Sequence, residues 1–304
     1  MKNNNGDVAP LLKALFAVVV WGASFIATKI ALRDIQPATL IWLRFAVGLA
    51  VIGAFIAIRK ESIRISRGSL ASFAVLGFFG IALHQWLQAT GLITAQASTT
   101  AWIVSTIPVF IAILGWLALR ETLGVIRTGG IVLAMAGVLL VVAHGDLRGL
   151  LMGQSFGRGD LLILLSAPNW AVFTILSRKV LQRHPAMVTM FYVMLTGWVY
   201  TSVLFFAENG IADLAHITLS TVMSLGFLGI LCTGIAYAYW YDALKVVPAA
   251  RIGSLLYVEP LVAVVVAALL LHEPILLAVL LGGVMILAGV WMVNRPERKR
   301  ASRP

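Results

Sequence analysis

Ten long apolar runs constrain this chain more than any other feature of its sequence. Each run is long enough, at about 20 residues, to cross roughly 30 Å of bilayer hydrocarbon as an α-helix. A transmembrane barrel would instead show segments of about 10 residues with alternating polarity. We therefore predict an all-α integral membrane protein with ten spans, at about 11–32, 38–58, 70–93, 98–119, 125–143, 160–181, 187–207, 218–243, 249–271 and 275–293.

The charges of the chain predict its orientation in the membrane. Only 12% of the residues are charged and 61% are hydrophobic, which excludes a soluble globular protein. The net charge of +11 raises the alternative of a nucleic-acid partner. If the N-terminus is cytoplasmic, however, 18 of the 23 basic residues lie on the inner side, 4 on the outer side, and Arg44 lies within a span. This bias follows the positive-inside rule, so we predict cytoplasmic termini, a lipid environment and no nucleic-acid partner.

The two halves of the chain resemble each other at an offset of 149 to 152 residues, as with Trp21 and Trp170 or Pro108 and Pro260. We predict a first repeat at 1–143, a linker at 144–159, a second repeat at 160–293 and a basic cytoplasmic tail at 294–304. Each repeat holds five spans, an odd number, so the repeats cross the membrane in opposite senses. Inverted repeats of this kind are typical of alternating-access transporters.

Several short motifs carry a resemblance to a known family: Trp21–Phe25, Arg44-Phe45, Pro108, Arg120-Glu121, Pro248–Arg251, Glu259-Pro260 and Glu273. Together they resemble the EamA-type repeat of the drug/metabolite transporter superfamily, in its ten-helix branch. The resemblance covers nearly the whole chain. It implies a multi-pass exporter of small metabolites in a bacterial inner membrane, similar to the exporters of aromatic and other neutral amino acids. The second copy departs from the pattern, since no arginine in it matches Arg44.

Polar side chains inside the spans are candidates for a substrate site. His84 and Gln88 in span 3, and Thr233 and Tyr237 in span 8, are each four residues apart and share a helical face. The repeat places Thr233 opposite His84 and Tyr237 opposite Gln88. Both stripes are therefore predicted to face one central cavity. The alternative is that they form hydrogen bonds between helices.

Further candidates for substrate binding come from spans 4, 6 and 9. They are Trp102, Ser105, Trp170, Ser254 and Tyr257. A cavity with aromatic faces, hydroxyls, an imidazole and few fixed charges suits a ligand that is neutral overall, or a zwitterion with an apolar side chain. A bulky anion would require clustered Arg and Lys.

Two charged residues inside the spans allow two interpretations each. Arg44 either snorkels to the outer interface or reaches a substrate carboxylate. Glu259, just before Pro260, either couples transport to protons or has a structural role. In the structural role it would bond a basic partner, or backbone donors that are freed where Pro260 perturbs the helix.

Other residues are assigned to the scaffold. Glu121 and Glu273 stand just before spans 5 and 10, where a carboxylate would cap the helix that follows. Pro108 and Pro260 interrupt spans 4 and 9 and are either gating hinges or static kinks. Recurring glycines that open spans 5 and 10 indicate close helix contacts between the repeats.

These features predict a secondary transporter that exports small neutral metabolites, above all aromatic or neutral amino acids. A multidrug or nucleotide-sugar carrier of the same superfamily is the alternative. A membrane enzyme acting on lipid-linked substrates would need clustered acid–base or metal-binding groups, and a channel would not need proline-broken repeats. We therefore expect no enzymatic activity, catalytic residue, metal or cofactor, and we expect a monomer. Proton antiport through His84 or Glu259 and uncoupled transport both stay open.

Overall fold

The computed structural model describes residues 8–119, 124–146, 148 and 157–295. Within these ranges all regular structure is helical, and ten helical spans are long and apolar enough to cross a membrane. Their bounds lie within a few residues of the predicted ones, so the all-α ten-span fold is confirmed. The spans are Val8–Ala31, Pro37–Ile58, Gly68–Leu92, Ala97–Leu117, Val125–Val142, Arg158–Leu181, Ala186–Ala207, Leu219–Val246, Arg251–Leu270 and Leu277–Asn294.

Six spans are continuous α-helices. A proline at the start of the second one suits its first turn, because that position needs no backbone N–H donor. These helices are α1 (Val8–Ala31), α2 (Pro37–Ile58), α7 (Val125–Val142), α9 (Arg158–Leu181), α10 (Ala186–Ala207) and α16 (Leu277–Asn294).

The third and eighth spans each contain a π-helical segment in the middle. In the third, Phe78–Leu83 separates α3 (Arg67–Gly77) from α4 (His84–Leu92). In the eighth, Phe227–Ile235 separates α12 (Leu219–Gly226) from α13 (Ala236–Val246). The two segments begin at positions that match under the 149-residue offset. A short helix α11 (Gly210–Asp213) and a 3-10 turn (Leu214–His216) connect the seventh and eighth spans.

The fourth and ninth spans are also interrupted at matching positions. The fourth consists of α5 (Ala97–Val104) and α6 (Ile107–Leu119), with a turn between them. The ninth consists of α14 (Ala249–Ser254), a 3-10 turn (Leu255–Val258) and α15 (Glu259–Leu270). Both interruptions come just before a proline of the sequence pattern, Pro108 and Pro260.

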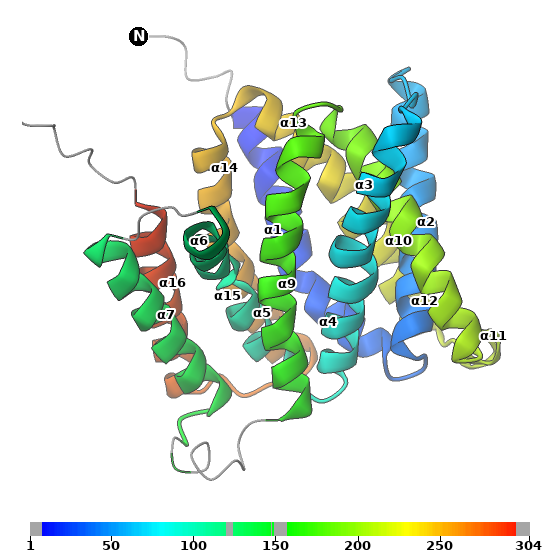
Figure 1. Ribbon diagram of the computed structural model, residues 1–304. Coiled ribbons are helices and arrows are strands. Elements are labelled where there is room, and N and C mark those ends of the chain that lie inside the picture. The colour runs from blue at the N-terminus through cyan, green and yellow to red at the C-terminus, as the bar shows by residue number, and fades with distance from the viewer. Residues whose placement is uncertain (1–7, 120–123, 147, 149–156, 296–304) are drawn as a thin grey trace, which may run out of the picture.

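Helices α7 and α16 lie side by side along one edge of the bundle (Figure 1). A Cβ added to Gly130 would lie 2.6 Å from the carbonyl oxygen of Gly289, and one added to Gly137 would lie 2.6 Å from that of Gly282. The early residues of one helix thus meet the late residues of the other, so the two helices are antiparallel. The predicted close contact through glycines is confirmed.

The same arrangement holds elsewhere in the bundle. Trp42 near the start of α2 stacks on Phe205 near the end of α10, with ring centroids 4.5 Å apart.

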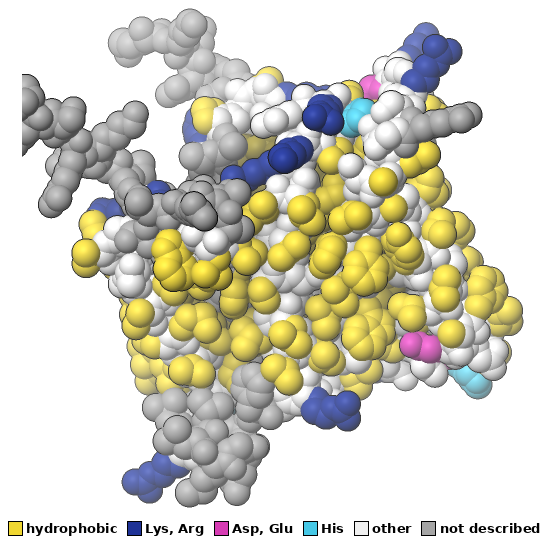
Figure 2. Space-filling view, viewed as in Figure 1, with side chains coloured by type: hydrophobic (Ala, Val, Ile, Leu, Met, Phe, Trp, Pro, Cys, Tyr) yellow, Lys and Arg dark blue, Asp and Glu magenta, His cyan; other side chains and the backbone are white. Residues whose placement is uncertain are grey.

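Helix α1 packs against α13 and α15, and its counterpart α9 packs against α4 and α6. Figure 2 shows hydrophobic side chains across the middle of the visible face, with Lys and Arg side chains toward its two ends.

Candidate functional site

Arg44 is the centre of a polar cluster inside the bundle. Its side chain is only 8% exposed. The Nε atom donates a hydrogen bond to the Thr233 hydroxyl at 3.0 Å, and Nη1 donates to the Gln85 amide oxygen at 3.1 Å. The side chain thus reaches across to the third and eighth spans instead of extending to the membrane surface, so the snorkelling interpretation is wrong. Within the described residues Arg44 forms no ion pair.

Glycines bring α2 and the eighth span close enough for this contact. A Cβ on Gly48, one turn after Arg44, would lie 2.3 Å from Cγ2 of Thr233. A Cβ on Gly229 would lie 2.6 Å from Cβ of Val47. Any larger side chain at these positions would separate the two backbones and draw Thr233 away from the guanidinium.

Aromatic rings from α1 and α13 form one wall beside the cluster. The Trp21 ring lies 5.3 Å from that of Tyr237 and 5.2 Å from that of Trp240, measured between centroids. The indole N–H of Trp21 donates to the backbone carbonyl of Cys232 at 3.1 Å. This bond holds the Trp21 ring in place against the π-helical segment. Cys232 itself is buried and has a free thiol.

His84 belongs to a second set of contacts, with α9. Its Nδ1 atom lies 3.2 Å from the Ser166 carbonyl oxygen, and its ring lies 4.5 Å from that of Trp170. In the third span, His84 of the predicted stripe is therefore buried against α9, whereas Gln85, which lies outside the stripe, faces Arg44. Gln88 is partly buried.

The contacts of the two π-helical segments correspond. Asn169 of α9 donates from its side-chain amide to the carbonyl of Phe79 at 2.7 Å, as Trp21 of α1 donates to that of Cys232. A π-helical segment departs from the α-helical bond ladder, and such segments are frequent at functional sites. In each case the first helix of one half supplies a donor to a π-segment carbonyl of the other half.

Glu259 is the first residue of α15 and lies in the middle of the ninth span. Its backbone carbonyl oxygen would be 2.6 Å from a Cβ on Gly22, the residue after Trp21. The side chain is partly exposed, and in the described part of the chain no hydrogen bond or ion pair involves its carboxylate. If Glu259 had a structural role, its carboxylate would bond a backbone donor or a basic side chain. Among the described residues it has no such bond.

The other predicted site residues lie apart from this cluster. Trp102 is fully buried against α16, where a Cβ on Gly283 would lie 2.5 Å from its ring. The hydroxyls of Ser105 and Ser254 donate to carbonyls of their own helical turns. The Tyr257 hydroxyl accepts a hydrogen bond at 3.1 Å from the side-chain amide at the end of α16. A role for these four residues in substrate binding stays a prediction.

Glu273 has a structural role that differs from the predicted one. It accepts hydrogen bonds from the backbone N–H groups of Ala97 and Ser98, at 2.8 and 3.1 Å, and from the Ser98 hydroxyl at 2.6 Å. It therefore caps α5, and the prediction that it caps the following helix, α16, is wrong. Helix α16 begins only at Leu277, whereas the start of α5 lies within reach. Glu121 lies outside the described residues.

Each end of the bundle carries an ionic contact between spans. At one end, Lys29 pairs with Glu273 at 3.8 Å and also donates to a backbone carbonyl of the loop before α5. At the other end, Asp242 accepts two hydrogen bonds of 2.8 Å from Arg59 and pairs with Lys13 at 3.6 Å. The bond to Asp242 raises the pKa of Arg59. The second contact ties α1, α2 and α13 together.

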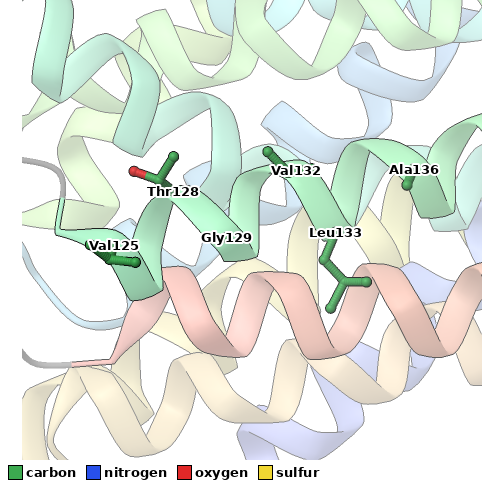
Figure 3. A pocket seen from close by; sticks show the side chains of 6 residues that line it. All are labelled: Val125, Thr128, Gly129, Val132, Leu133 and Ala136. Atoms are coloured by element: carbon green, nitrogen blue, oxygen red, sulfur yellow. The ribbon is translucent and has the colours of Figure 1, made fainter.

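A shallow groove of about 560 Å³ lies away from the polar cluster, on α7 (Figure 3). All of its lining residues belong to that one helix, and Val132 within it is 63% exposed. It offers one hydroxyl and no charged group, so it has the character of a lipid-facing helix surface. The lining residues are Val125, Thr128, Gly129, Val132, Leu133 and Ala136.

Comparisons with known proteins agree with this architecture. The model of the EamA-like transporter family matches twice, at residues 9–143 and 157–295. An uncharacterized transporter of Archaeoglobus fulgidus is 27% identical over 95% of this chain and 98% of the relative. A probable amino-acid metabolite efflux pump of Escherichia coli is 28% identical over 92% of both chains, and a probable terminal-alkyne amino-acid exporter of Streptantibioticus cattleyicolor is 27% identical over 97% and 98%. One crystal structure, 19% identical, covers 95% of this chain and 98% of its own with a TM-score of 0.63, which shows a shared fold.

The ten apolar spans and the family match over both halves identify the chain as a multi-pass membrane transporter for small molecules. The chain belongs to the EamA-like transporter family, in the drug/metabolite transporter superfamily. It is a transporter and not an enzyme.

Proposed function

We propose that this protein exports small neutral metabolites, above all amino acids with aromatic or apolar side chains, across a bacterial inner membrane with both termini in the cytoplasm. The observation that carries the proposal is Arg44. A buried guanidinium is costly unless it is paired, and here its described partners are two neutral groups, Thr233 and Gln85. A substrate carboxylate would complete the site, because the guanidinium fork matches that group.

The surroundings of Arg44 favour an apolar side chain on the substrate. Trp21, Tyr237 and Trp240 supply aromatic faces from α1 and α13, and Trp170 adds one from α9. Two relatives are themselves named as a probable amino-acid metabolite efflux pump and a probable terminal-alkyne amino-acid exporter. Among the described residues, Arg44 is the one arginine in this polar cluster, which disfavours a nucleotide-sugar carrier, because such a carrier would need several cations for its phosphates.

The transport mechanism that fits this architecture is alternating access by a monomer. Counterpart helices of the two halves are antiparallel where α7 meets α16 and where α2 meets α10. This is the relation that two inverted repeats at 1–143 and 160–293 would produce. Two such units of opposite sense can form two near-equivalent states, one open to each side. The interruptions before Pro108 and Pro260 are the proposed hinges.

Transport in proteoliposomes tests the proposal. Purified protein should give saturable flux of a neutral aromatic amino acid, and unlabelled neutral amino acids should compete better than dyes or nucleotide sugars. Folded protein without flux of any neutral amino acid would rule out the substrate class.

Flux with and without a pH gradient, in the native protein and in Glu259→Gln, separates proton coupling from uncoupled transport. A native response to the gradient that disappears in Glu259→Gln would assign coupling to this residue.

A further inference from the structure

Two charged side chains in the middle of the bundle have no counter-ion among the described residues. One is the cation Arg44 and the other is the anion Glu259. By contrast, Lys29, Glu273 and Asp242, toward the ends of the bundle, all form ion pairs. Unpaired charges of both signs inside a membrane protein are costly and mark functional sites.

Both charged residues are linked by contacts to one aromatic wall, formed by Trp21 and Tyr237. Arg44 bonds Thr233, and Tyr237 comes four residues later in the eighth span. Tyr237 packs against Trp21 with centroids 5.3 Å apart, and the neighbour of Trp21, Gly22, contacts the backbone of Glu259. A small ligand against the rings of Trp21 and Tyr237 would therefore have a cation near one end and an anion near the other.

We propose that Arg44 binds the carboxylate and Glu259 the ammonium group of a zwitterionic substrate, so that these two residues select amino acids over analogues lacking either charge. This rests on the proposed function. The fork of Arg44 matches a carboxylate, and the adjoining aromatic faces of Trp21 and Tyr237 also favour an ammonium group. A ligand with both charges leaves neither protein charge unpaired. A ligand with one charge leaves Arg44 or Glu259 uncompensated on binding.

The experiment compares three ligands of the same size in proteoliposomes: phenylalanine, its amide without a carboxylate, and 3-phenylpropionate without an ammonium group. The native protein should prefer phenylalanine to each analogue by at least about a hundredfold, because a site built to bond a polar group strongly rejects an analogue that lacks it. Arg44→Gln should abolish the preference over the amide and keep the preference over the acid. Glu259→Gln should do the reverse.

Controls separate this inference from a failure of folding or of the proposed function. Arg178→Gln removes an exposed cation at the end of α9 and should leave all three rates unchanged. If a variant does not fold, the native protein alone decides, since equal binding of the three ligands, measured as thermal stabilisation in detergent, would overturn the inference. Unchanged selectivity in folded Arg44→Gln or Glu259→Gln would also overturn it. If native protein carries no amino acid at all, the proposed function itself fails.

Discussion

At the scale of single residues, Asp34 shows how a partly exposed carboxylate joins two distant parts of the chain. It lies after α1 and accepts hydrogen bonds from the backbone N–H of Thr218 and from the hydroxyls of Thr218 and Thr221, at the start of α12. These bonds hold the pKa of Asp34 below its ordinary value. A carboxylate with a lowered folded-state pKa stabilises the fold above its unfolded pKa, and this contribution is lost as pH falls through the folded value.

We therefore expect Asp34→Asn to lower the melting temperature at neutral pH and to flatten the loss of stability in acid. The relevant window lies below about pH 4, the ordinary pKa of an aspartate. Melting temperatures in detergent from neutral to acidic pH, for the variant and the native protein, check this. Glu208→Gln removes a carboxylate from the same end of the bundle and serves as the control. Parallel curves for Asp34→Asn and native protein would contradict the assignment.

The identity of the interior charges could be read from the sequence, but their partners could not. Arg44 and Glu259 stand out because they interrupt apolar runs. Which groups they face depends on how the helices rotate and cross, and this is set by close approaches such as that at Gly48. The sequence does not single out Gln85, because a regular helix directs it away from the face of His84. Trp21 could have been recognised in the sequence as a candidate, because it matches Trp170 in the second repeat.

At the scale of elements, the interruptions of the spans differ in how visible they are in the sequence. Those in spans 4 and 9 could be predicted, because a proline cannot continue the helical hydrogen bonds. The π-helical segments in spans 3 and 8 could not, because no proline marks them and their carbonyls are satisfied by distant side chains of Asn169 and Trp21. The capping of α5 by Glu273 was also missed, because the carboxylate comes from a loop 176 positions away.

The contact between α7 and α16 gives a prediction with a control one residue away. A Cβ on Gly130 would lie 2.6 Å from a backbone oxygen of α16, whereas a Cβ on Gly129 would meet only the end of a methionine side chain at 3.5 Å. Gly130→Ala should therefore force the helices apart and cost about 1–3 kcal/mol of stability. Gly129→Ala should be neutral or slightly stabilising, because alanine favours a helix. Thermal melts of both variants in detergent measure the difference, and equal melting temperatures would show that this contact adapts freely.

At the scale of the whole molecule, the first helix of each half of the chain packs against spans of the other half. Helix α1 packs on spans 8 and 9, while α9 packs on spans 3 and 4. The two ends of the bundle are each closed by an ionic contact, Lys29 with Glu273 and Asp242 with Arg59. The polar cluster around Arg44 thus lies between two ends that are each joined by charged groups. A transporter of alternating access would have to release these contacts in turn.

The orientation of the whole bundle is testable because the native cysteine is buried. Cys232 has 0% exposure and should not react with a membrane-impermeant maleimide. The positive-inside bias predicts that Arg64 lies in the cytoplasm and His216 outside, and both residues are exposed. In intact cells, His216→Cys should therefore be labelled at once, and Arg64→Cys only after the membrane is permeabilised. The native protein is the control in both conditions. The reverse order of labelling would place the termini outside. Labelling of both positions in intact cells would contradict the ten-span arrangement, because five spans separate these two loops and an odd number of crossings puts the loops on opposite sides.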